Sequence, residues 1–146
     1  MNAIILSKFN ARKTVPPQEH KRVALRMHTA LAVFLAGVGT REEWADIADS
    51  VNIVEALATM GKLDPTEVGP LVTSATAGLV VAAKCPPGMM AFGQDAAAAA
   101  RRIVCLHDEA IGKYSAATMY EASHLVLSKI AEQVTNADNG VIVVSA

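Results

Sequence analysis

The chain has 146 residues, of which 52% are hydrophobic and 18% charged, and its formal net charge is −1. This composition excludes an intrinsically disordered chain, and the length suits one domain with a core of its own. The longest uncharged run, residues 68–83, is shorter than the roughly 20 residues of a membrane-spanning helix, and no signal peptide is visible. We therefore expect a cytoplasmic protein that does not contact membranes. Its two cysteines occur in no paired motif, which predicts free, buried thiols in a reducing compartment.

The N-terminal residues 1–16 are predicted to form an extended, basic arm. Residues 3–6 are a short β-prone run, and the Pro-Pro pair at 16–17 disfavours a helix before it and favours one directly after it. Residues 1–26 hold six Lys and Arg against one Glu, a net charge of +5, whereas residues 27–146 hold seven basic against thirteen acidic residues, a net charge of −6. A basic arm on an acidic body could contact nucleic acid, an acidic partner or the acidic face of a second copy.

Residues 23–60 have the periodicity of two amphipathic helices joined by a tight glycine turn. Apolar side chains of the first helix recur at intervals of three and four residues: Val23, Met27, Ala30, Leu31, Phe34 and Val38. Leu25 and Leu35 widen this stripe, so we expect the first helix to be largely buried. Gly37 and Gly39 are expected to end it.

The second helix of this pair is predicted to begin with a capping box, in which the side chains of Thr40 and Glu43 each accept from the other's backbone N–H. One apolar face follows, with Trp44, Ile47, Ala48, Val51, Val54, Leu57 and Ala58. Gly61 is expected to end the helix. Because the turn is short, the two helices should form an antiparallel hairpin whose apolar faces the later segments cover.

A third helical segment is predicted within residues 64–84. Asp64, Pro65 and Glu67 are typical of a helix start. The Gly-Pro pair at 69–70 is expected to break the segment, so that only a turn forms before it and the helix proper begins at Leu71.

Two more helices are predicted after the breaker at residues 85–88. The first lies within residues 90–111 and is ended by Gly112, and its run of alanines at 96–100 suits a crowded crossing of helices. Ser115 can cap the last helix. That helix has its apolar face at Met119, Val126, Leu127, Ile130 and Val134.

The sequence therefore predicts an all-α fold: a bundle of about five helices around an antiparallel helical hairpin. The helical domain covers residues 17–135, after the arm at 1–16, and residues 136–146 form a C-terminal tail or short strand. The tail contains a second β-prone run at 141–144, which could pair with the run at 3–6 as a ribbon, within one chain or between two. Two frayed chain ends explain the same residues.

Glu121 and His124 have the Glu-x-x-His spacing that places two metal ligands on one helix face. Carboxylate-bridged bundles need a second such pair and two further glutamates, and no other histidine has a carboxylate at this spacing. Surface residues of a helix explain the pair as well. We expect no cofactor, and a metal-binding bundle is only the third hypothesis.

Two features concern nucleic-acid binding. Residues 46–57 have some features of a helix-turn-helix, but the candidate recognition helix has Glu55 and no Lys or Arg before Lys62, which favours an uninterrupted helix. Basic side chains near the N-terminus are better candidates, because they could contact phosphates without reading sequence: Lys8, Arg12, Lys13, Lys21, Arg22 and Arg26. A solvated arm that aids solubility explains the same residues.

The sequence has no recognisable catalytic signature. It lacks a Gly-x-Ser-x-Gly motif, and the Gly-Val-Gly at 37–39 lacks the lysine and the preceding strand of a phosphate-binding loop. His107 is two positions from Cys105, which places the two side chains on different sides of a helix. We therefore expect the protein not to be an enzyme.

The segments Arg-Met-His-Thr-Ala-Leu at 26–31 and Gly-Val-Gly-Thr at 37–40 resemble a loose group of small helical proteins from proteobacterial plasmids and prophages, some labelled Fis-like regulators. The resemblance covers residues 20–60 and implies an origin in a mobile element. The regulator label requires a basic helix-turn-helix, from which this chain departs, so the label and any functional residue are not carried over.

These observations predict a non-enzymatic, self-associating helical interaction protein, an accessory or host-modulating factor of a phage or plasmid. Its partner would be a second copy or a host protein. The first alternative is a nucleic-acid-associated transcriptional regulator that binds through the basic arm. The second alternative is the metal-binding helical bundle.

Overall fold

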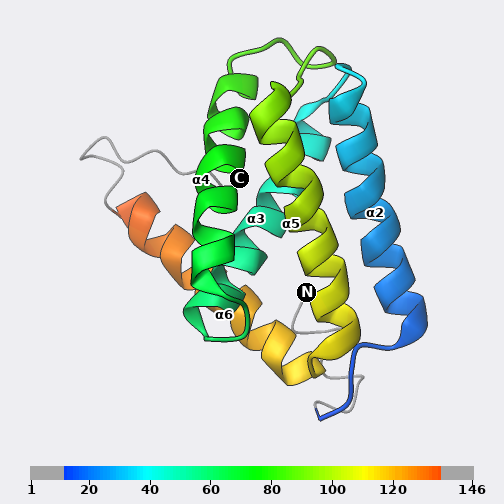
Figure 1. Cartoon of the computed structure of the whole chain (residues 1–146), viewed down its shortest axis with the longest axis vertical. Helices are drawn as coiled ribbons and strands as arrows, with labels where there is room; N and C mark the ends of the chain where they lie inside the picture. Colours follow the sequence, from blue (N-terminus) through cyan, green and yellow to red (C-terminus); the bar gives the residue numbers. More distant parts are fainter. Residues whose placement is uncertain (1–11, 136–146) are drawn as a thin grey trace.

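The computed structural model describes residues 12–135, which fold into a bundle of five helices (Figure 1). The helices are α2 (Pro17–Leu35), α3 (Arg41–Thr59), α4 (Pro65–Ala82), α5 (Gln94–Lys113) and α6 (Ala116–Thr135). The only β-type contacts among the described residues are two isolated bridges, Thr14–Ser115 and Gly39–Met90. The all-α prediction is therefore confirmed, whereas the β-prone runs at 3–6 and 141–144 lie outside the described residues.

Helix α3 is the centre of the bundle, because it packs against each of the other four helices (Figure 1). Helices α2 and α4 flank it, and α5 packs against α2, α3 and α4. Helix α6 runs obliquely across one end of the bundle, where it packs against α3. No helix of the described region has the length and apolar character that crossing a membrane would require.

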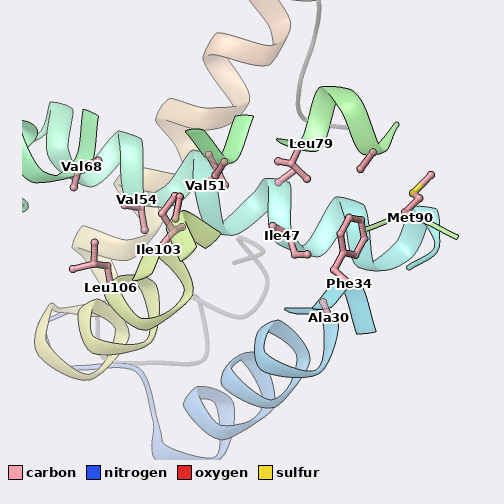
Figure 2. Close-up of a cluster of buried hydrophobic side chains, with 14 residues drawn as sticks. Ala30, Phe34, Ile47, Val51, Val54, Val68, Leu79, Met90, Ile103 and Leu106 are labelled. Carbon is pink, nitrogen blue, oxygen red and sulfur yellow. The ribbon is translucent and has the colours of Figure 1, made fainter. Parts of the chain in front are cut away.

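Two clusters of buried side chains hold the helices together. The first follows α3, with Leu79 of α4 on one side and Phe34 of α2 and Ile103 of α5 on the other (Figure 2). The second joins α6 to α2, α3 and α5 through Met27, Leu57, Val104, Ile111 and Met119. Burying one such side chain contributes about 1.5–3 kcal/mol, so these clusters are the main source of stability.

The turn between α2 and α3 forms as its residues predict. Gly37 has φ of +78°, a conformation that side-chain-bearing residues rarely adopt, and both halves of the capping box of Thr40 and Glu43 are present. Gly39 bridges to Met90, and a Cβ there would lie 2.5 Å from the Phe34 ring. This position therefore needs glycine for space, and it ties the turn to the loop before α5.

The predicted break at residues 69–70 is wrong, because α4 continues through Pro70 to Ala82. Pro70 lies near the helix start, where its missing N–H leaves only one carbonyl, that of Thr66, without its helical donor. Val68 before the proline and Ala75 after it are both buried in the first cluster. Packing on both sides of the proline thus outweighs the local cost.

The last two helices begin near the predicted positions. Helix α5 begins at Gln94, after a loop held by the Gly39–Met90 bridge, and it continues through Gly112 to Lys113, so the predicted end at Gly112 is wrong. The alanine run does form a close crossing, since a Cβ on Gly78 of α4 would meet Ala96. Ser115 accepts from the N–H of Thr118 at 3.2 Å, which confirms the predicted cap of α6.

Helix α2 is less buried than expected. Leu25 is 71% exposed and Leu35 38%, because α2 packs on α3 and α5 with one side and faces solvent with the other, and Val38 in the turn after α2 is 54% exposed. The exposed side chains of Leu25, Leu35 and Val38 are available for contacts outside the described bundle.

The prediction of two buried thiols is wrong for Cys105, which is exposed. Cys85 is half-buried, and both cysteines are free.

Candidate functional site

A groove of about 540 Å³ opens between α2, α3 and α6, with residues of α5 at its floor. We call it the α2–α6 groove. Val15, just before α2, lines the end at which the described chain begins. The volume lies within the range of about 300–1,000 Å³ that is typical of ligand-binding pockets.

One wall of the groove is an apolar stripe of α6. Met119, Val126, Leu127 and Ile130 recur at helical spacing and all line it. They differ in burial: Met119 is 3% exposed, Val126 and Ile130 are half-buried, and Leu127 is 63% exposed. The second half of α6 therefore presents apolar side chains that the described bundle does not cover.

Charged side chains of α2 and α3 form the opposite rim. Arg26 donates from Nε to the Asp46 carboxylate at 2.8 Å and so joins the two helices. Within α2, Arg22 pairs with Glu19 at 2.5 Å, and this hydrogen bond lowers the pKa of Glu19. Asp49 lies one turn beyond Asp46; part of the residue stays exposed, but the protein atoms around its carboxyl and the nearby Asp46 raise its pKa. The rim has three carboxylates against two guanidinium groups, so it is acidic.

A serine and a histidine meet at the floor of the groove. His107 Nδ1 of α5 lies 3.1 Å from Ser50 Oγ of α3, and burial lowers the pKa of His107 to about 4, so its ring is neutral at pH 7. A serine beside a neutral histidine is the start of a nucleophile-and-base arrangement. The Ser50 side chain is fully buried, however, and out of reach of a substrate. The pair instead satisfies two buried polar groups and ties α3 to α5.

A second polar cluster joins α2 to α5 outside the groove. Asp108 binds two histidines of α2, with His20 Nε2 at 2.5 Å from one carboxylate oxygen and His28 Nε2 at 3.1 Å from the other. Burial acts to raise the pKa of Asp108, but the hydrogen bonds with both imidazoles outweigh it and lower the pKa. Within residues 12–135, no three His, Cys, Asp or Glu side chains are arranged to hold a metal ion. The shared carboxylate of Asp108 joins α2 to α5.

The structure separates the basic residues singled out from the sequence. Lys8 lies outside the described residues, Arg12 and Lys13 are exposed before α2, and Lys21 is exposed on α2. Arg22 and Arg26 instead belong to the groove rim, where carboxylates bind them. Two of the five described residues are thus bound by carboxylates, and binding of phosphates by the set stays a prediction.

The other candidates have simpler surroundings. Glu121 and His124 are both exposed on α6, where the His124 ring lies 6.3 Å from that of Tyr120. The described chain offers them no third metal ligand. Residues 46–57 all lie within α3, which confirms the uninterrupted helix that the sequence favours over a helix-turn-helix.

Sequence reasoning missed the groove and both histidine clusters. The pair of Glu19 and Arg22 was recognisable from its three-residue helical spacing. The pairs Arg26–Asp46 and His107–Ser50 join residues 20 and 57 positions apart. They depend on the register between helices, for which a single sequence contains no local signal.

No family model, no curated protein and no solved structure matches this chain. The resemblance to plasmid and prophage proteins therefore stays a prediction.

Proposed function

We propose that this chain is a non-enzymatic interaction protein that binds an apolar, positively charged segment of a protein partner in the α2–α6 groove. One observation supports this most: the apolar stripe of α6 faces the groove while Leu127 remains 63% exposed. Apolar surface that a fold leaves uncovered beside a recess is typical of interaction sites.

The two walls of the groove indicate the chemistry of the segment. Consecutive aliphatic side chains suit the wall formed by Val126, Leu127 and Ile130. The opposite rim is acidic, so a Lys or Arg in the segment would be attracted, and an added carboxylate would be repelled by Asp46 and Asp49. The predicted hairpin of α2 and α3, which we propose organises the fold, would present this rim.

The proposal includes self-association through a different surface. The two loops at one end of the bundle, residues 36–40 and 85–93, contain no charged residue. They are joined by the Gly39–Met90 bridge, and they expose Val38 by 54% and Met89 by 65%. In a two-fold symmetric dimer this end would meet its own copy without like-charge repulsion. An accessory role for a phage or plasmid and a cytoplasmic location are parts of the proposal that only the sequence supports.

A displayed peptide library selected on the full chain tests the groove. The expected sequences combine consecutive aliphatic residues with Lys or Arg. The Leu127→Asp variant should lose their binding, because it places a carboxylate in the apolar wall. The matched control is Val81→Asp on α4, which is equally 63% exposed and outside the groove. Peptides that bind both variants alike, or a selection without enrichment, would contradict the proposal.

A further inference from the structure

We propose that the α2–α6 groove selects a partner segment with a single basic side chain, and that Asp49 is the residue that pairs with this side chain. The inference rests on the proposed function and names the residue that sets its charge specificity. Three observations support it: the ion pairs along the acidic rim, the position of Asp49, and the net charge of the rim.

Two of the three rim carboxylates are already bound by arginines of α2. Arg22 donates to the Glu19 carboxylate at 2.5 Å, and Arg26 donates to the Asp46 carboxylate at 2.8 Å. The side chains of Glu19 and Asp46 are only 15% and 12% exposed, whereas both arginine side chains are more than half exposed. Each arginine therefore covers its carboxylate and leaves little of it for a cation from outside.

Asp49 is the third rim carboxylate, and its surroundings differ. It lines the groove one turn of α3 beyond Asp46, and part of the residue is exposed. No Lys, Arg or His side chain of residues 12–135 forms a salt bridge with it. The surrounding protein atoms and the nearby Asp46 raise its pKa, so they disfavour its ionised form. A cation bound beside Asp49 would favour that form again.

The net charge of the rim limits how many cations the groove accepts. With its three carboxylates ionised and its two guanidinium groups charged, the rim has a net charge of −1. One basic side chain neutralises this charge. A second one would meet the exposed guanidinium groups of Arg22 and Arg26 and be repelled. The groove should therefore favour one Lys or Arg over a polybasic segment.

The apolar wall determines where in the segment the basic side chain lies. Val126, Leu127 and Ile130 belong to α6, whereas Asp49 belongs to the opposite rim. A segment that packs its aliphatic side chains on α6 has to direct its basic side chain to the other side, towards α3. The basic position should therefore have a fixed spacing from the aliphatic positions in all peptides that bind the groove.

A double-mutant cycle with a selected peptide tests the pairing. The probes are the tightest peptide from the displayed library and the same peptide with Gln in place of its Lys or Arg. Fluorescence anisotropy measures both against the parent chain and against Asp49→Asn. We expect Asp49→Asn to weaken binding of the charged peptide about fivefold and to leave binding of the Gln peptide unchanged. The matched control is Glu55→Gln, which removes a negative charge from an exposed site on α3 outside the groove and should change neither affinity.

An NMR titration of the Asp49 carboxyl carbon provides a second measurement. Its midpoint should fall when the charged peptide saturates the protein, and it should not fall with the Gln peptide, because only a cation favours the ionised carboxylate. An unchanged midpoint would overturn the pairing, and so would equal effects of Asp49→Asn on the two peptides. Preferred binding of peptides with several basic residues would overturn the selection of a single one.

The failure of this inference can be told apart from the failure of the proposed function. Peptides that lose binding in Leu127→Asp but show no coupling to Asp49 would refute the pairing and leave the groove as the binding site. A selection without enrichment would refute the proposed function and the pairing together.

Discussion

The buried histidine at the floor of the groove makes the stability of the protein depend on pH. Burial lowers the pKa of His107 from 6.5 to about 4. In the unfolded chain the imidazole takes up a proton as the pH falls through 6.5, while the folded protein keeps it neutral until about 4. The contribution of neutral His107 to the free energy of unfolding is therefore complete above pH 6.5. It is lost progressively as the pH falls from 6.5 towards 4.

The size of the effect follows from the difference between the two pKa values. Each unit is equivalent to about 1.4 kcal/mol, so the full loss is about 3 kcal/mol, of which about 2 kcal/mol falls between pH 7 and pH 5. This range lies above the ordinary pKa of the carboxylates, and the pKa values of Asp108, Glu19 and Glu43 are lowered further. The pKa of Asp49 is raised, so its protonation favours the folded state as the pH falls and offsets part of the loss. The loss between pH 7 and pH 5 should therefore come mainly from His107.

Urea unfolding measures this loss, with the fluorescence of Trp44, the only tryptophan, as the signal. His107→Gln keeps a polar side chain that cannot be protonated, so its free energy of unfolding should change about 2 kcal/mol less than that of the parent between pH 7 and pH 5. The control is His124→Gln, because His124 is exposed on α6. The same pH dependence in the parent and in His107→Gln would refute the reasoning, and so would an NMR titration of His107 with a midpoint near 6.5.

Two further predictions concern the turn and the uncharged end. Gly39→Ala should lower the free energy of unfolding by about 1–3 kcal/mol in the same urea titration, since its Cβ would lie 2.5 Å from the Phe34 ring, and an unchanged free energy would contradict this. Val38→Asp should reduce self-association in size-exclusion chromatography with light scattering, because it buries a like charge pair in a symmetric contact; an unchanged mass would contradict this.

Local signals were sufficient to predict most of the helix ends. Pro17 begins α2, the capping box of Thr40 begins α3, and Gly37 ends α2 with a positive φ. Each of these effects depends on neighbouring residues only, which a sequence displays directly. The predicted break at Pro70 is wrong because it considered local signals alone. Contacts with other helices bury Val68 and Ala75, and this burial keeps the helix continuous through Pro70.

The candidate site was less predictable, because its residues meet across helices. The sequence marks Arg22 and Arg26 as basic, but whether they face phosphates or carboxylates depends on how α2 lies against α3. Sequence spacing relates His107 only to its neighbours along the chain, such as Cys105, whereas its partner is Ser50 on another helix. The burial and the hydrogen-bond partners of these side chains depend on tertiary packing. Helical periodicity predicts which face of a helix is buried, but not how far one helix is shifted along its neighbour.

The first 26 residues are basic and the rest of the chain is acidic, and in the described chain this difference allows α2 to form ion pairs with its neighbouring helices. Arg26 binds Asp46 of α3, and His20 and His28 bind Asp108 of α5, so the basic side of α2 meets acidic groups on both neighbours. Exposed pairs of this kind add only about 0–1 kcal/mol each. Their effect is mainly on specificity, since a shifted α2 would leave carboxylates facing one another.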